Sequence, residues 1–137
     1  MSADGATQLE QYNLDDSRVG LAGYSPVSYV DLGRAELGRP NHFAEHEGVK
    51  YYFTDERQLD RFVHDPAKYV PAFGGWCAFG MSVGKRFRPN PTKFKVVDGR
   101  LLMFLNDLEV DAAELWSQGD ESEHLRNANK NWDSAGK

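Results

Sequence analysis

The stretch that decides the fold runs from Phe94 to Leu105 and reads FKVVDGRLLMFL. Two runs of β-branched, aromatic and other apolar residues flank the dipeptide Asp98-Gly99. Because Asp-Gly readily adopts the two positive φ angles of a type I′ turn, this pattern predicts a β-hairpin with strands over residues 94–97 and 101–105. It is the clearest hairpin signal in the sequence, so antiparallel β-structure is expected to contribute to the fold.

A second hairpin is predicted earlier in the chain. Residues 42–46 alternate in polarity, Glu47-Gly48 supplies a turn, and residues 49–53 are β-branched and aromatic. A short apolar run at residues 19–22 predicts a first strand. No internal repeat or low-complexity run is evident in the sequence.

Helices are predicted where apolar residues recur at helical spacing. Thr54 and Asn106 are the expected N-caps of two of them, and Gly119 is the expected stop of one. The fold class is therefore α+β, with one small antiparallel sheet of two hairpins and the N-terminal strand packed against about four helices. The predicted helices cover residues 55–64, 76–83, 107–118 and 121–132.

Length and composition are typical of a single-domain globular protein. The 137 residues suit one domain at residues 18–133, with a flexible N-terminal arm at 1–17 and a C-terminal tail at 134–137. A net charge of −5 argues against a general nucleic-acid or anionic-membrane binder. Because Cys77 is the sole cysteine, an intramolecular disulfide and a cysteine-rich zinc site are excluded.

The sequence as written carries no targeting or membrane signal. No apolar stretch approaches the roughly 20 residues of a membrane span. The polar, acidic N-terminus has neither the basic region nor the apolar region of a signal peptide. The expected location is therefore cytoplasmic for the chain as written, and periplasmic if a signal has been removed.

A glycine-rich segment at residues 74–84, reading GGWCAFGMSVG, contains the residues best suited to chemistry. If residues 76–83 are helical, Cys77 and Met81 lie on one face at positions i and i+4. Two sulfur atoms on one face can hold a soft ion such as Cu(I), or both side chains can fill the hydrophobic core. The candidate metal ligands, for copper or zinc, are Cys77, Met81, His64, His42 and His46.

Large aromatic side chains suggest a second kind of site. Gathered around a concavity beside Cys77, they would line a pocket for a small ligand. The same rings are equally suited to a hydrophobic core. The candidate ligand-binding residues are Tyr24, Tyr29, Tyr52, Tyr69, Trp76 and Trp132.

Nucleophilic catalysis by Cys77 is a third hypothesis. The pair Gly74-Gly75 just before a helix would place Cys77 in the first turn, where the thiolate is favoured. The chain shows no local cysteine-hydrolase signature, and no histidine is close to Cys77 in the sequence. A non-enzymatic binding domain is therefore favoured over a thiol-dependent enzyme, and no catalytic residue is assigned.

Six stretches, in a fixed order and with similar spacing, carry a resemblance to a known family. They are AGYSPVSY at 22–29, the run from Tyr51 to Phe62, DPAKYVP at 65–71, GGWCA at 74–78, DGRLL at 98–102 and ANKNW at 128–132. Together they resemble the YHS-domain family, named for a Tyr-His-Ser signature, and most closely its short stand-alone bacterial members. The resemblance covers nearly the whole chain after the N-terminal arm.

The resemblance implies a small α+β domain related to TRASH-type metal-binding modules, which occur in proteins that handle copper and other heavy metals. Such modules carry cysteines at three positions that here read Ser28, Thr54 and Gln58. Hydroxyl and amide groups are poor ligands for soft metals. Two interpretations follow: a copper site that depends on Cys77 with Met81 and a histidine, or a structural or partner-binding domain that has lost its metal site.

Overall fold

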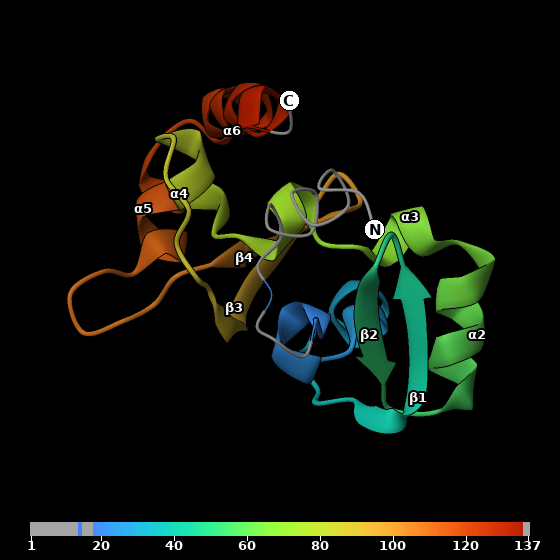
Figure 1. Ribbon diagram of the computed structural model, residues 1–137. Coiled ribbons are helices and arrows are strands. Elements are labelled where there is room, and N and C mark those ends of the chain that lie inside the picture. The colour runs from blue at the N-terminus through green and yellow to red at the C-terminus, as the bar shows by residue number, and fades with distance from the viewer. Residues whose placement is uncertain (1–13, 15–17, 136–137) are drawn as a thin grey trace.

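The computed structural model describes residues 14 and 18–135, and it confirms the α+β class. Short helices pack around two separate antiparallel sheets of two strands each. The helices α2 (Glu56–His64) and α3 (Pro66–Tyr69) lie beside the first sheet (Figure 1). Most of the predicted N-terminal arm and the last residues of the predicted tail lie outside the described residues.

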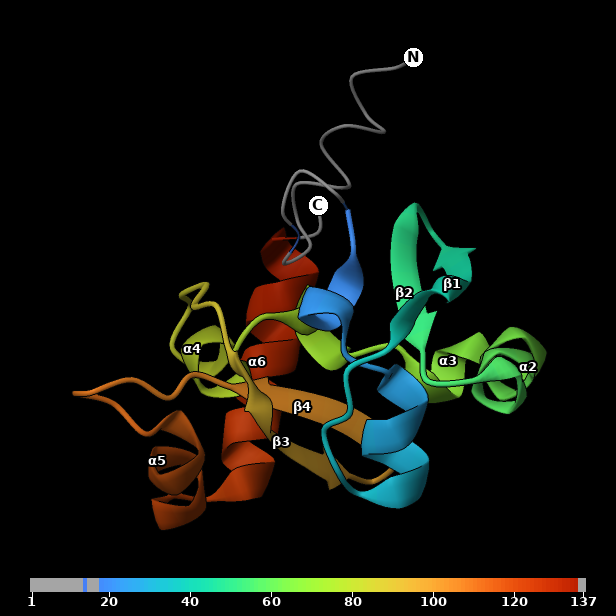
Figure 2. The same ribbon diagram turned by 90° about the horizontal axis from the view of Figure 1, so that it is seen from below.

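The elements follow one another in two similar series joined by α3. The first series comprises η1 (Gly20–Gly23), η2 (Ser28–Leu32), β1 (Arg39–His46), β2 (Val49–Phe53) and α2. The second comprises η3 (Ala72–Gly75), α4 (Ala78–Ser82), β3 (Asn90–Val97), β4 (Arg100–Phe104) and α5 (Ala112–Gln118). The last helix, α6 (Glu121–Ala135), packs against α4, and both views show it away from the first hairpin (Figures 1 and 2).

Both predicted hairpins are confirmed. Their turns, Glu47-Gly48 and Asp98-Gly99, have positive φ at both residues, as a type I′ turn requires. Each first strand starts earlier than predicted, and its extension contains a proline, Pro40 in β1 and Pro91 in β3. The register shifts in both extensions, which is where a strand tolerates proline because the regular ladder is interrupted.

The start of each series has the same unusual backbone. Residues 21–23 and residues 73–75 each have positive φ at three consecutive positions, a conformation that residues other than glycine rarely adopt. Two positions later, Ser25 and Cys77 each accept the amide N–H of the residue three positions further on, at 3.3 Å for Ser25 Oγ and 3.5 Å for Cys77 Sγ. Ser25 and Cys77 therefore occupy equivalent positions.

The chain thus contains an internal structural repeat, although no repeat is evident in its sequence. The repeat lies in backbone conformation, element order and strand register, whereas few side chains are identical between the series. Identical equivalent pairs include Gly23 and Gly75, Pro40 and Pro91, Phe43 and Phe94, Gly48 and Gly99, and Phe53 and Phe104. These matches are scattered over a long interval, so the sequence pattern alone does not reveal them.

The predicted strand at residues 19–22 is wrong. Val19 forms a parallel bridge with Lys50, but Leu21 and Ala22 have φ of 57° and 53° inside η1. Left-handed residues cannot continue an extended strand. The predicted single sheet is also wrong in detail, because the two hairpins form separate sheets.

Three helix starts differ from their predictions, and one of them is that of α4, which begins at Ala78 with Cys77 as its N-cap instead of at residue 76. The helix α2 begins after Asp55 instead of Thr54, and α5 begins after Asp111 instead of Asn106. Both aspartates accept an amide N–H of the first helical turn. The later start of α5 follows from Asp107, whose side chain accepts two backbone N–H groups and holds the preceding segment in a turn.

Two hydrophobic clusters form the core, and β4 contributes to both. Leu101 and Met103 lie in the first cluster with residues of the first series, whereas Leu102 and Phe104 lie in the second cluster. All four side chains are almost completely buried. A strand that is covered on both faces is apolar at every position, in contrast to the alternating pattern of a strand with one exposed face.

The equivalent strand of the first series, β2, has only one face fully buried in the core. By hairpin register, the equivalents of Leu101 and Met103 are Lys50 and Tyr52, which are half-buried on the outer face of β2. Residues of the first series pack against the outer face of β4, and the outer face of β2 is less fully covered. Leucine and methionine are therefore buried on β4, where lysine and tyrosine stay half-buried on β2. The strand β4 thus packs in both halves, and Tyr29 adds further contacts between the halves with Pro91 and Phe94 of β3.

We expect Leu101→Ala to lower the free energy of unfolding by about 2–5 kcal/mol, because it removes a completely buried side chain and leaves a cavity. The matched control is Lys50→Ala at the equivalent position, which should change stability by no more than about 0.5 kcal/mol. Urea unfolding followed by circular dichroism measures both. Similar losses for the two variants would contradict the role assigned to β4.

Candidate functional site

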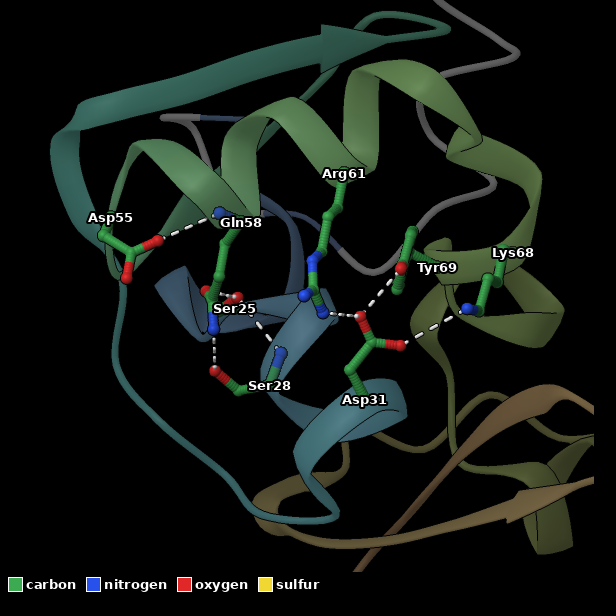
Figure 3. Close-up of polar contacts among 8 residues, drawn as sticks. All are labelled: Ser25, Ser28, Asp31, Asp55, Gln58, Arg61, Lys68 and Tyr69. Carbon is green, nitrogen blue, oxygen red and sulfur yellow. Dashed lines mark hydrogen bonds and ion pairs between the residues drawn. The ribbon is translucent and has the colours of Figure 1, made fainter.

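A closed hydrogen-bonded network lies between η2 and the start of α2 (Figure 3). The side-chain carbonyl of Gln58 accepts the hydroxyl of Ser25 at 2.6 Å and the amide N–H of Thr54 at 3.0 Å. Its amide nitrogen donates to Ser28 Oγ at 2.9 Å, and the Ser28 hydroxyl donates in turn to Glu36 Oε1 at 2.7 Å. Ser25 and Ser28 are completely buried, and Gln58 nearly so.

This network contains Ser28, Thr54 and Gln58, the positions at which the sequence resemblance leads us to expect the cysteines of a metal-binding module. Thr54 and Gln58 are close in the sequence, and the structure brings the distant Ser28 next to Gln58, while Thr54 takes part through its backbone N–H. These residues do not fit a soft metal, because hydroxyl and amide groups are weak ligands for it, and the Ser28 hydroxyl and the Gln58 side chain are already engaged with each other. Buried polar groups with satisfied partners stabilise a fold instead of leaving a site open.

Asp31 forms a second polar cluster beside the network (Figure 3). Its Oδ2 accepts Arg61 Nη1 at 3.0 Å and the Tyr69 hydroxyl at 2.8 Å, and its Oδ1 lies 3.4 Å from Lys68 Nζ. Burial opposes ionisation, but the hydrogen bonds from Tyr69 and Arg61 and the charge of Lys68 outweigh it and hold the pKa of Asp31 below its usual value. These contacts tie η2 to α2 and α3, with His64 nearby at the edge of the same open basin.

Cys77 is completely buried in the second core cluster. Its sulfur accepts the amide N–H of Leu105 at 3.2 Å and that of Gly80 at 3.5 Å, so it caps both the end of β4 and the start of α4. Burial raises the pKa of the thiol, and the amide N–H groups of Gly80, Leu105 and Phe79 oppose this rise without cancelling it. The environment therefore favours the neutral thiol over a reactive thiolate.

The other candidate metal ligands lie in two groups. Met81 shares the buried second cluster with Cys77. His42 and His46 project from β1 and His64 lies at the end of α2, all in the first series. Within residues 14 and 18–135, the structure contains no group of three His, Cys, Asp or Glu side chains arranged to hold a metal ion.

The candidate aromatic residues do not gather in one pocket. Tyr29 and Tyr69 are buried in the first cluster, with Tyr24 packed against it, while Trp76 and Trp132 pack against the second cluster. Tyr52 is half-buried on the outer face of β2. Burial raises the pKa of Tyr29, whose hydroxyl donates to the backbone carbonyl of Pro91 at 2.5 Å and so joins the two halves.

A cleft of about 300 Å³ extends between the turn ends of the two hairpins. His46 and Tyr51 line it from the first hairpin, Arg100 from the second, Phe73 from η3 and Trp132 from α6. Only His46 and Trp132 of these were candidate site residues in the sequence. The cleft could not be located from the sequence because its walls come from both halves of the repeat.

Arg100 lines this cleft and is held by two contacts. The central carbon of its guanidinium lies 5.0 Å from the centre of the Phe73 ring, in cation–π contact. Its Nη1 donates to Asn129 Oδ1 on α6 at 2.9 Å. These two contacts fix the direction of the guanidinium while the side chain stays half-buried.

No family model, curated protein or solved structure matches the chain. Among the described residues, no helix combines the length and the apolar character needed to cross a bilayer. The function is therefore inferred from the geometry of the two polar clusters, Cys77 and the cleft.

We expect Cys77 to react slowly with iodoacetamide in the native protein and rapidly in urea, because its sulfur is buried. Its raised pKa means that the unfolded chain, with a thiol pKa of about 8.5, loses this proton at lower pH than the folded chain. The contribution of this thiol to stability is therefore complete below pH of about 8.5 and is lost as pH rises above that value.

The measurement is urea unfolding between neutral and alkaline pH for wild type and Cys77→Ala. The wild type should lose stability with rising pH more steeply than the variant, since other groups that titrate in this range are common to both. Fast native labelling, or identical pH dependence of the two proteins, would contradict the assignment.

Proposed function

We propose that this chain is a YHS-like domain that acts by binding and not by catalysis, and that an internal hydrogen-bonded network has replaced its metal site. The observation that carries the proposal is the convergence of Ser28, Thr54 and Gln58. By the resemblance these residues stand where the modules carry thiols, and the side chain of Gln58 contacts both the Ser28 hydroxyl and the backbone N–H of Thr54.

The chemistry of the network supports the loss of a metal. Three thiolates around an ion form a charged centre whose stability comes from the metal bonds. Here neutral groups occupy those positions, and each side-chain donor of Ser25, Ser28 and Gln58 in the network has an acceptor. The network can therefore hold η2 against α2 without an ion, at the usual net gain of about 1 kcal/mol per hydrogen bond.

The environment of Cys77 supports a binding domain over an enzyme. A nucleophilic cysteine is expected to be accessible, with a lowered pKa and a base nearby. Cys77 is buried, its pKa is raised, and its sulfur receives backbone N–H groups. A copper site formed by Cys77, Met81 and a histidine is the competing proposal, favoured by the position of both sulfur atoms in one cluster.

Metal titration separates these proposals. We expect Cu(I) and Zn(II) to bind weakly and equally to wild type and to Cys77→Ala, because the buried sulfur already accepts two backbone N–H groups. Competition with a chromophoric chelator measures the affinities. Tight binding at one ion per chain in the wild type, lost in Cys77→Ala, would overturn the proposal and support the copper site.

Restoring the thiols tests the location of the lost site. The triple variant Ser28→Cys, Thr54→Cys, Gln58→Cys should bind Zn(II) at one ion per chain and much more tightly than wild type, because three thiolates would converge. A matched control places cysteines at exposed positions of three different elements: Arg57→Cys, Lys93→Cys, Arg126→Cys. If the triple variant has native circular dichroism but binds no more tightly than this control, the proposed site is wrong.

A further inference from the structure

We propose that the cleft between the two hairpin ends binds a small planar carboxylate, with Arg100 holding the carboxylate and the aromatic wall holding the ring. This inference rests on the proposed binding function and names its site and ligand class. Three observations support it: the position of the cleft, the presence of Arg100 where the equivalent residue of the first hairpin is Val49, and the side chains that line the cleft.

The position of the cleft is the first argument. Its lining comes from both hairpins, from the segment between the two series and from α6. Ligand sites occur preferentially where two structural units meet, since the junction leaves a concavity that neither unit fills alone. A volume of about 300 Å³ is at the small end of the range for ligand pockets, which suits a compound of one or two rings.

The second argument is the comparison of Arg100 with the residue at the equivalent position of the first hairpin. Its equivalent in the first hairpin is Val49, which is almost completely buried and also lines the cleft. The repeated fold therefore accepts an apolar residue at this position, and its architecture does not require a cation there. A half-buried arginine costs desolvation that an apolar residue avoids, so we infer that its charge serves a ligand.

The third argument is that two contacts hold the Arg100 guanidinium in place while some of its N–H donors stay available to a ligand. Within the described part of the chain, Nη1 donates to Asn129, and no acceptor engages Nε or Nη2. The contact with the Phe73 ring restrains the position of the guanidinium. A directed guanidinium of this kind recognises a carboxylate through two parallel hydrogen bonds, which a neutral group cannot reproduce.

The remaining wall favours a flat apolar ring over a purely polar anion. Phe73 and Tyr51 are buried aromatic residues of the lining, and Trp132 adds a partly exposed indole from α6. Glu47 is the acidic residue of the lining, but most of its side chain is exposed, so solvent screens its charge. Its presence disfavours ligands of high negative charge, which is a reason to expect a single carboxylate.

The test uses 2-naphthoate and its neutral analogue 2-naphthamide as probes, with two-dimensional NMR of the full chain as the readout. We expect 2-naphthoate to give saturable shifts of the Trp132 indole signal and of the Gly74 and Gly99 amides, which border the cleft. The Trp132 indole is assigned by its absence in Trp132→Phe. The neutral amide should bind at least about tenfold more weakly, as expected for loss of charge-assisted hydrogen bonds.

Three variants make the outcome specific. Arg100→Gln should weaken 2-naphthoate binding by about tenfold or more, Arg100→Lys should weaken it less, and Arg126→Gln on the exposed face of α6 should leave it unchanged. Equal binding of the two probes, equal affinity of Arg100→Gln and wild type, or shifts confined to the basin around Asp31 would overturn the inference.

Failure of this experiment is distinguishable from failure of the proposed function. The cleft experiment involves no metal, and the thiol-restoration experiment involves no carboxylate. A chain that fails to bind 2-naphthoate but gains zinc binding in the triple variant would retain the proposed function with a different ligand site.

Discussion

The burial of β4 on both faces is the constraint on which the rest of the structure depends. Leu101 and Met103 fill the core of the first series, while Leu102 and Phe104 fill that of the second. The chain before α4 follows the same strand, because Pro71 and Cys77 form parallel bridges with Leu101 and Met103. One short strand thus joins the two hydrophobic clusters, positions Cys77 and places Arg100 at the cleft.

Equivalent positions in the two halves perform the same structural task with different chemistry. Ser25 and Cys77 both accept an amide N–H at the start of a helical segment. In the first series the amide at the end of the hairpin, that of Thr54, reaches Ser25 through the side chain of Gln58, whereas in the second the Leu105 amide contacts the cysteine sulfur directly. Cys77 therefore acts as a structural hydrogen-bond acceptor, and this role accounts for its burial.

The sequence predicted the local features well where a single short segment carries the signal. Asp98-Gly99 and Glu47-Gly48 specify their turns because their backbone preferences are local. The first strand at residues 19–22 and the cap at Asn106 were wrong, because left-handed geometry in one case and the side chain of Asp107 in the other override the pattern. Of the cleft, only His46 and Trp132 were among the predicted site residues, since its walls meet only through tertiary packing.

The sequence by itself determined the α+β class, the two hairpins and the absence of a cysteine-rich metal centre, because turn chemistry, side-chain periodicity and residue counts act locally or on the whole chain. Only the tertiary structure decided that the chain is a repeat, that Ser28 and Gln58 share one network, and that Cys77 is enclosed. These features depend on contacts between residues far apart in the chain, and the packing on both faces of β4 determines which of them meet.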